Sequence, residues 1–228
     1  MKSFIIMEGV QMATRLGNKT IRLDKKPKII SSAAAVGKKE GDGPLKKDFD
    51  LIFEDTKLGE ESWEKAESDI LKAAVNKAIT KSHLKNTDIE AVFSGDLLNQ
   101  CIGSTFGLRE LNIPFCGMYG ACSTMALSLC TASLAIESGG FSRVMAATSS
   151  HFCSAERQFR HPLEYGGQRT PTAQWTVTGS GALILADANT TNDPFVDKIH
   201  YGTIRDLGVT DENNMGAAMA PVDVKIEP

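Results

Sequence analysis

Residues 113–140 read IPFCGMYGACSTMALSLCTASLAIESGG, and this stretch decides the fold. It begins with an apolar run from Ile113 to Met118, which predicts a strand. Residues 119–124 are small or polar and predict a tight turn. Met125–Glu137 then follows a helical pattern that ends at the Gly139-Gly140 pair. Because this helix is apolar almost all round, we expect it to lie inside the domain.

The same region raises the question of a membrane span, because residues 111–136 carry no charged side chain. Its length would suffice, since a span needs about 20 residues. Pro114, Gly117, Gly120 and several Ser and Thr residues interrupt the apolar run, however, and a lipid-exposed helix would not tolerate them without partners. We therefore expect no transmembrane segment. We also expect no signal peptide, because the first apolar run is short and ends at Glu8.

The flanking sequence repeats the alternation of strand and helix. Ser62 is a suitable N-cap for a helix whose apolar residues recur at spacings of three and four. Asp96 follows a short apolar run and can cap the next helix. The expected elements are helices over 62–84 and 97–111 and strands over 89–94, 143–148, 182–186 and part of 195–204. This alternation predicts a layered α/β fold with a largely parallel sheet.

Composition excludes several classes of protein. The chain has 228 residues, of which 42% are hydrophobic and 23% charged, which excludes a disordered or fibrous chain. The net charge of −3 argues against a nucleic-acid partner, because such domains are usually strongly basic. The five cysteines form no CxxC pair, which indicates a reducing compartment and mostly buried, free thiols. We expect Cys101, Cys116 and Cys130 to be structural.

Cys122 is the strongest candidate for chemistry. It lies between the apolar strand and the helix, where the small Gly120 and Ala121 permit a sharp turn. A cysteine at a helix N-terminus can have a lowered pKa, and the neighbouring backbone N–H groups can hold a carboxylate or an oxyanion. The alternative is a buried structural cysteine.

Two further groups of residues are weaker candidates. Asp96 lies at the carboxyl edge of a strand, where open α/β sheets place ligands, although a helix N-cap explains it equally well. The loop that begins at His151 carries Arg157 and other arginines that suit planar carboxylates, or it is a solvated or dimer-facing loop. We reject a zinc site at His151 and Cys153, because no second ligand pair lies nearby in sequence, and we expect no metal site.

Six motifs occur in a fixed order along the chain. They are GDLLNQ at 95–100, GACST at 120–124, ATSSH at 147–151, AERQFR at 155–160, EYGGQ at 164–168 and TVTGSGA at 176–182. Together they resemble the stage V sporulation protein AD family of endospore-forming bacteria, and the similarity runs from about residue 29 to residue 221. The motif GACST alone is shared with many thiolase-like proteins.

The resemblance implies a thiolase-like α/β/α fold, in which two similar halves pack as a pseudo-dimer. It implies an N-terminal extension over residues 1–28 and a thiolase-like N-terminal domain over 29–228 that includes the start of the second half. Family members are considerably longer, and residues 222–228 no longer look like the family. We therefore expect a truncated chain whose exposed apolar surface drives association, as a homodimer or an aggregate.

The resemblance also implies a function. It implies a non-catalytic protein that binds dipicolinic acid, as its Ca²⁺ chelate, for uptake into the developing spore. It implies partners among the membrane channel proteins of the same system and a place at the spore inner membrane or on the forespore cytoplasmic side. Cys122 falls on the thiolase nucleophile position and Asp96 on the family's ligand pocket. We name Asp96, Cys122, Ser123, His151 and Arg157 as candidate ligand-binding residues, with no cofactor beyond Ca²⁺ on the ligand.

Two alternatives remain open. The chain could be an acyltransferase or condensing enzyme that uses Cys122 as an acyl-thioester nucleophile. That reaction needs a general base, and none is evident in the sequence. The chain could also be a scaffold that only holds the components of a membrane channel complex.

Overall fold

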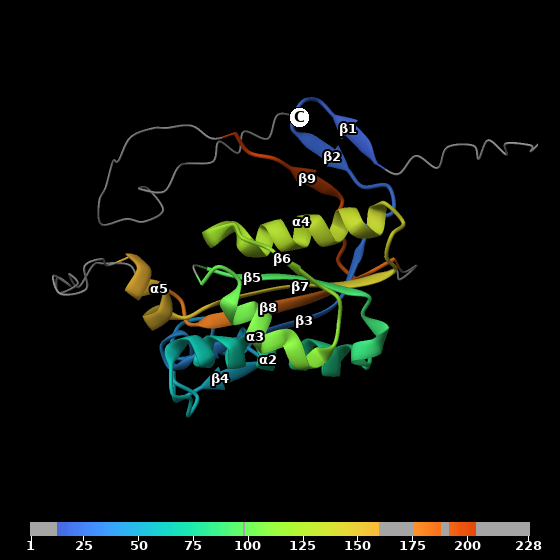
Figure 1. The fold of residues 1–228 in the computed structure, drawn as a ribbon. Coiled ribbons are helices and arrows are strands. Elements are labelled where there is room, and N and C mark those ends of the chain that lie inside the picture. The colour runs from blue at the N-terminus through green and yellow to red at the C-terminus, as the bar shows by residue number, and fades with distance from the viewer. Residues whose placement is uncertain (1–12, 98, 160–175, 188–191, 204–228) are drawn as a thin grey trace, which may run out of the picture.

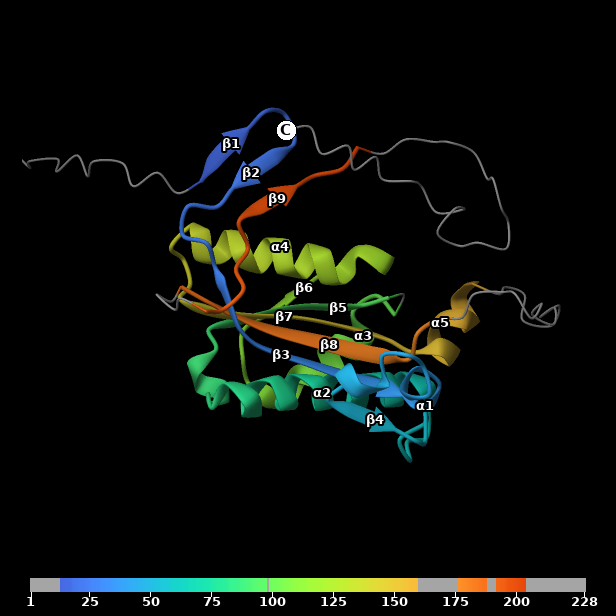
Figure 2. The same ribbon diagram turned by 180° about the vertical axis from the view of Figure 1, so that it is seen from behind.

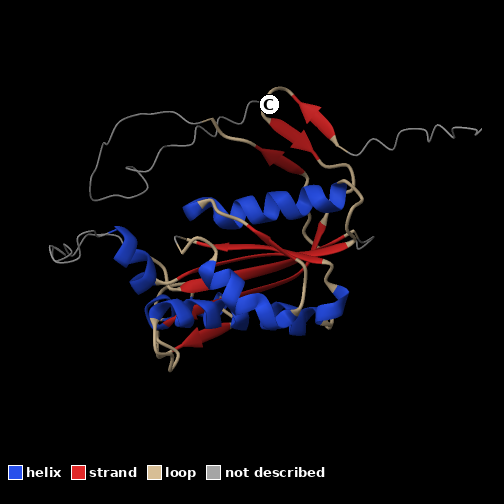
Figure 3. Cartoon of the chain, viewed as in Figure 1, coloured by secondary structure: helices blue, strands red, loops and turns tan. Residues whose placement is uncertain are grey.

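The structure is a computed structural model that describes residues 13–97, 99–159, 176–187 and 192–203, with the side chains of residues 156–159 left outside the description. Its centre is a six-stranded sheet (Figures 1 and 3). In spatial order the strands are β4 (Leu51–Phe53), β3 (Lys28–Gly37), β8 (Gly179–Ala186), β7 (Arg143–Ser150), β5 (Ala91–Asp96) and β6 (Phe115–Gly117).

The sheet is mixed rather than largely parallel. β3 and β4, β5 and β6, and β5 and β7 pair in parallel, as expected for strands joined through helices. β8 instead runs antiparallel to both of its neighbours, β3 and β7. The prediction of a largely parallel sheet was therefore wrong at this strand, because strand direction depends on non-local pairing that the alternation pattern does not encode.

Helices cover both faces of this sheet. α2 (Trp63–Ser82) and α3 (Ile102–Leu108) lie on one face and α4 (Thr124–Glu137) on the other, as the two opposite views show (Figures 1 and 2). One hydrophobic core lies between the sheet and α2, and a second lies between the sheet and α4. The predicted α/β/α layering is confirmed.

The predicted helix at 62–84 is confirmed with its cap. The Ser62 hydroxyl accepts a hydrogen bond from the Lys65 N–H, which satisfies one of the free donors at the start of α2. Ala66, Ile70 and Ala74 are fully buried against the sheet, as their helical spacing predicts. The helix ends at His83, whose φ of 57° places it in the left-handed region.

The helix after Cys122 lies at the surface, so the prediction of an interior helix was wrong. One face of α4 packs on the sheet through residues such as Ala132 and Ile136. On the opposite face, which we call the open face, the described residues leave Ala126 and Leu127 exposed, Leu127 at 38%. The apolar composition of a helix predicts that it is buried. The sequence of that one segment does not show, however, whether other elements provide enough surface to bury both of its faces.

A second, small sheet lies beyond α4 (Figure 1). It is antiparallel, and its strands are β1 (Thr14–Leu16), β2 (Thr20–Arg22) and β9 (Lys198–His200). Within the segment predicted over 195–204, β9 is the strand found among the described residues 195–203. Two of its strands come from the predicted N-terminal extension, so residues 14–22 have regular structure.

The remaining elements are short. They are α1 (Lys38–Gly41), α5 (Phe152–Phe159) and the 3₁₀ turns η1 (Lys46–Asp48), η2 (Asn86–Asp88), η3 (Arg109–Leu111) and η4 (Ala121–Ser123). Among the described residues, no helix combines the length and the apolar composition that a membrane crossing requires.

Candidate functional site

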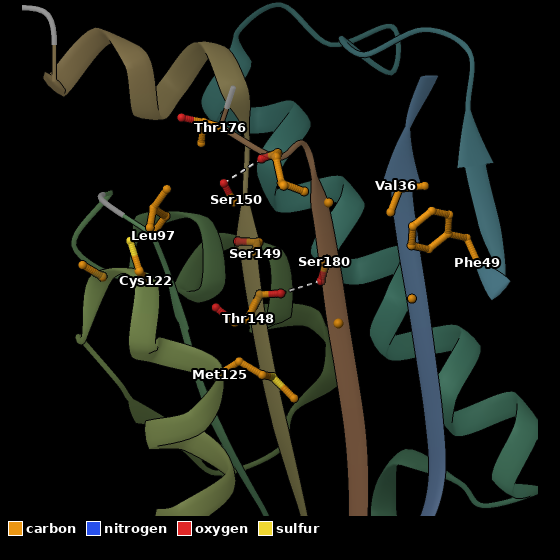
Figure 4. Close-up of a pocket in the computed structure, with 15 residues that line it drawn as sticks. Val36, Phe49, Leu97, Cys122, Met125, Thr148, Ser149, Ser150, Thr176 and Ser180 are labelled. Atoms are coloured by element: carbon orange, nitrogen blue, oxygen red, sulfur yellow. Dashed lines mark hydrogen bonds between the residues drawn. The ribbon is translucent and has the colours of Figure 1, made fainter. Parts of the chain in front are cut away.

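A pocket of about 450 Å³ opens at the edge of the sheet where β3, β5 and β7 end (Figure 4). Open α/β sheets place their ligands at this edge, because the loops that follow parallel strands meet there. The residues that line it are Ala34, Val36, Phe49, Leu97, Ala121, Cys122, Met125, Thr148, Ser149, Ser150, Thr176, Val177, Gly179, Ser180 and Gly181.

The lining combines apolar walls with a strip of hydroxyl groups. Val36 and Phe49 lie on one side of the pocket, and Leu97, Cys122 and Met125 lie on the other (Figure 4). Between them, the ends of β7 and β8 present serine and threonine side chains. None of the lining side chains that the structure describes is charged. The pocket therefore suits a ligand with flat apolar faces and no large net charge.

Three serine residues of the lining donate their hydroxyl hydrogen to the protein. The Ser149 Oγ donates to Glu67 Oε1 at 3.1 Å, the Ser150 Oγ to the carbonyl of Val177 at 2.7 Å, and the Ser180 Oγ to the carbonyl of Thr148 at 2.8 Å. A hydroxyl has one hydrogen and two lone pairs. Ser150 therefore has only lone pairs left for a ligand, and lone pairs favour a cation or a hydrogen-bond donor over a bare carboxylate. The Ser149 hydroxyl instead lies on the other face of the sheet, beside Glu67 of α2 and Gly103 of α3.

Cys122 lies at the pocket and is exposed. It belongs to η4, which leads directly into α4, so the predicted position at a helix start is confirmed. The turn is sharp because Ala121 has a φ of +46°, a left-handed conformation that residues other than glycine rarely adopt. Cys116 is also exposed, so the prediction that this thiol is buried was wrong, since β6 is an edge strand.

Asp96 lies behind the pocket rather than in its lining. Its side chain is fully buried, and its Oδ2 accepts a hydrogen bond from the Gly103 N–H at 3.1 Å. Burial raises the pKa of this carboxyl, while backbone N–H groups of residues 99–104 oppose the rise. The helix it caps is α3, which begins at Ile102 and not at Leu97 as predicted.

The other three predicted residues occupy different positions. Ser123 is exposed, and its Oγ donates to the Gly120 carbonyl at 2.7 Å, which closes the turn before α4. His151 is buried, its Nε2 lies 2.8 Å from the Thr56 carbonyl oxygen, and burial lowers its pKa. Neither of these two residues lines the pocket. The Arg157 side chain lies outside the described residues.

Glu67 is a residue that the sequence reasoning missed. It is 1% exposed and accepts hydrogen bonds from Asn99, Ser149 and Ser154. Burial, together with the nearby charge of Asp96, raises its pKa to about 7. Helical periodicity could have found it, because position 67 lies four residues after Trp63 and three before Ile70, on the buried face of α2.

Comparison with known proteins gives this chain a family. The family model of stage V sporulation protein AD matches residues 17–226. The chain belongs to the stage V sporulation protein AD family. This match begins before residue 29 and ends after residue 221, so it extends beyond the predicted limits at both ends. The expectation that residues 222–228 no longer resemble the family was wrong, because residues 222–226 lie within the match.

A relative within the family is known from Bacillus subtilis (strain 168). This stage V sporulation protein AD is 45% identical to the present chain over 193 residues. The alignment covers 85% of this chain and 56% of the relative. The chain thus spans little more than half the length of the curated family member it matches.

Among solved structures, similarity extends to two synthases. The 3-oxoacyl-[acyl-carrier-protein] synthase III of Aquifex aeolicus is 16% identical, with 72% of this chain and 55% of that chain covered and a TM-score of 0.48. The priming β-ketosynthase of the R1128 polyketide pathway is also 16% identical, with 78% and 53% covered and a TM-score of 0.48. The α/β/α architecture is evident from the helices and strands of this chain itself.

Proposed function

We propose that this chain is a thiolase-like, non-catalytic binding protein for dipicolinic acid, taken up with Ca²⁺ into the developing spore. Membership of a sporulation family supports the cellular setting. The proposed partners are the membrane channel proteins of the same system. The proposed place is peripheral, at the spore inner membrane or on the forespore cytoplasmic side.

The observation that carries the proposal is a pocket of about 450 Å³ with apolar walls, serine and threonine residues, and no charged side chain among its described lining residues. Dipicolinate is a flat pyridine ring with two carboxylates, so its ring faces suit walls such as Val36 and Phe49. The free dianion would find no charged partner among the described lining residues. A one-to-one complex with Ca²⁺ is neutral, and Ca²⁺ prefers oxygen ligands, of which the Ser150 hydroxyl is one in the lining.

The proposed residues then have different tasks. Cys122 contacts the ligand directly, because it lines the pocket. Ser123 and Asp96 hold the two turns that border the pocket, through their hydrogen bonds to Gly120 and Gly103. His151 supports the end of β7 from behind. Arg157 remains a proposed ligand contact on the basis of its charge alone.

Calorimetric titration tests the proposal. We expect dipicolinate to bind with Ca²⁺ present and to bind at least tenfold more weakly with a chelator of Ca²⁺. Benzene-1,3-dicarboxylate is the matched control ligand, because it has the same shape but lacks the ring nitrogen that completes the chelate. Absence of dipicolinate binding under both conditions would refute the proposal.

A pocket-filling variant locates the binding. A side chain built at Gly181 would meet no atom within 4 Å, so Gly181→Val projects into the pocket without a clash. We expect this variant to fold and to lose dipicolinate binding. Ala126→Val, at an exposed position of α4 that does not line the pocket, is the control and should bind as the wild type does.

An acyltransferase is the second candidate, because Cys122 is an exposed thiol beside an apolar pocket. The described lining residues include no histidine or carboxylate that could act as its general base. Incubation with an acyl-CoA, followed by mass spectrometry, distinguishes the two functions. A covalent increment that Cys122→Ala abolishes would favour the enzyme. Normal dipicolinate content in spores carrying Cys122→Ala or Asp96→Ala would instead favour a scaffold.

A further inference from the structure

The hydroxyl groups that line the pocket differ in what they offer to a ligand. The Ser150 Oγ donates its hydrogen to the carbonyl of Val177, so only its lone pairs remain for a ligand. Thr148 lies two residues earlier on β7, lines the pocket and is half-buried. Among the residues that the structure describes, the Thr148 hydroxyl has no hydrogen-bond partner. Its hydrogen is therefore free for a ligand.

The alternation of side chains along β7 places the Thr148 side chain on the face of the sheet opposite α2. The Ser149 Oγ points to the α2 face, where it lies 3.1 Å from the Oε1 atom of Glu67. Successive residues of a strand point to opposite faces of the sheet. Thr148 and Ser150, which flank Ser149, therefore both point to the other face, which α4 partly covers.

The strands beside β7 indicate the same face for Thr148. It pairs with Gly95 of β5 and with Gly181 of β8, and Gly181 pairs in turn with Ala34 of β3. A Cβ built at Gly95 would meet the Cγ2 atom of Thr124, the first residue of α4, at 2.9 Å, whereas a Cβ built at Gly181 would meet no atom within 4 Å. The Thr148 side chain thus rises from a row of otherwise small residues at the pocket (Figure 4).

We propose that Thr148 is a specificity-determining residue of the pocket, whose hydroxyl donates a hydrogen bond to a carboxylate oxygen of the ligand. This inference rests on the proposed function, since it assigns a further contact in that same binding site. Dipicolinate with Ca²⁺ offers both a cation, which suits the lone pairs of Ser150, and carboxylate oxygens, which suit the free hydrogen of Thr148. Residues two apart in a strand lie roughly 7 Å apart, so one such ligand can contact both hydroxyls.

A merely structural role for the Thr148 hydroxyl makes a different prediction. Thr148→Val keeps the shape of the side chain and removes the hydroxyl, and valine is favoured in strands. Because the hydroxyl has no partner among the described residues, the variant loses no hydrogen bond within this part of the fold. We therefore expect Thr148→Val to unfold at the same denaturant concentration as the wild type or at a higher one.

The test is dipicolinate affinity with Ca²⁺ present, measured by calorimetry. We expect Thr148→Val to weaken binding about tenfold, as for loss of a hydrogen bond to a charged group. Thr148→Ser keeps the hydroxyl and should bind within about threefold of the wild type. Thr131→Val is the matched control, because Thr131 lies on α4 outside the lining and its Oγ1 donates to the Leu127 carbonyl at 2.8 Å. It should change the affinity less than twofold.

The outcomes separate this contact from the binding function. Equal affinities of Thr148→Val and the wild type would overturn the contact while leaving the binding function intact. Equal losses from Thr148→Val and Thr148→Ser would also overturn it, because the hydroxyl would then not matter. A lower unfolding midpoint of Thr148→Val would show that the hydroxyl serves the fold. A wild-type chain that binds no dipicolinate would overturn the binding function and, with it, the role of Thr148.

Discussion

Burial brings three titratable side chains toward their neutral forms behind the pocket. Desolvation raises the pKa of Glu67 to about 7, raises the pKa of Asp96 and lowers the pKa of His151. The two carboxyls also repel each other when both are ionised, which adds to the shift at Glu67. The protein interior beside the pocket therefore favours the neutral forms of these three side chains. The described lining of the pocket carries no charged side chain either.

The raised pKa of Glu67 predicts a pH-dependent stability. A carboxyl whose folded pKa exceeds its unfolded value stabilises the fold below the unfolded pKa, and this contribution is lost as the pH rises through the folded pKa. Between about pH 4.5 and about pH 7 the loss is roughly 3 kcal/mol. Glu67→Gln stays neutral and avoids it. Urea unfolding should therefore show the variant gaining stability relative to the wild type between pH 5 and pH 8.

The comparison between variant and wild type cancels the titration of His151, whereas the titration of Asp96 depends on the charge at position 67. Asp96 acts in the same direction as Glu67, whereas His151, whose pKa is lowered, destabilises the fold as the pH falls. Both residues are present in the two proteins. A constant stability difference from pH 5 to pH 8 would show that the carboxylate of Glu67 is not shifted by its surroundings.

At the scale of elements, the pocket depends on the close approach of two turns. The end of β5 and the turn after β6 meet at Gly95, where an added Cβ would lie 1.8 Å from the carbonyl oxygen of Met118. The sequence predicted the strand, turn and helix around Cys122, because their signals are local. It did not predict the loop between Asp96 and α3, where Gln100 and Cys101 adopt positive φ without a glycine to indicate it.

Two glycine substitutions test this geometry. Gly95→Ala places a methyl group against backbone that cannot yield, so we expect a loss of more than about 4 kcal/mol or failure to fold. Gly181→Ala is the matched control on β8, where nothing lies within 4 Å, and it should change stability by less than about 1 kcal/mol. Denaturant unfolding measures both. Equal stabilities would mean that the two turns do not meet at Gly95.

At the scale of the molecule, sequence reasoning failed where a structure depends on contacts between residues far apart in the chain. β3 was not predicted, because the residues KIISSAAAVG lack the β-branched alternation of a typical strand. Its conformation is imposed by pairing with β4 and β8 and by packing on α2. The pocket similarly assembles six separate segments. One motif located Cys122, whereas the partners of Glu67 became visible only when α2, β7 and α5 were placed together.

The exposed apolar surface predicts association of this chain. Tyr119 is 58% exposed on the turn after the edge strand β6, and Leu127 is 38% exposed on the open face of α4, where it lies beside Gly120 of the same turn. Neighbouring apolar side chains on one side of a molecule favour contact with another apolar surface, because contact removes them from water. We expect dimers or larger species in sedimentation velocity, together with binding of a dye specific for apolar surface.

A charged substitution locates the contact. Leu127→Glu should shift the sedimentation profile toward the monomer and reduce dye binding, since a buried carboxylate in the contact would be unpaired. Leu45→Glu is the control, because Leu45 is 58% exposed on the turn between α1 and η1, and α1 lies across the sheet from α4 (Figure 2). A monodisperse wild-type monomer that binds no dye would refute the prediction. Equal effects of the two variants would place the contact elsewhere on the surface.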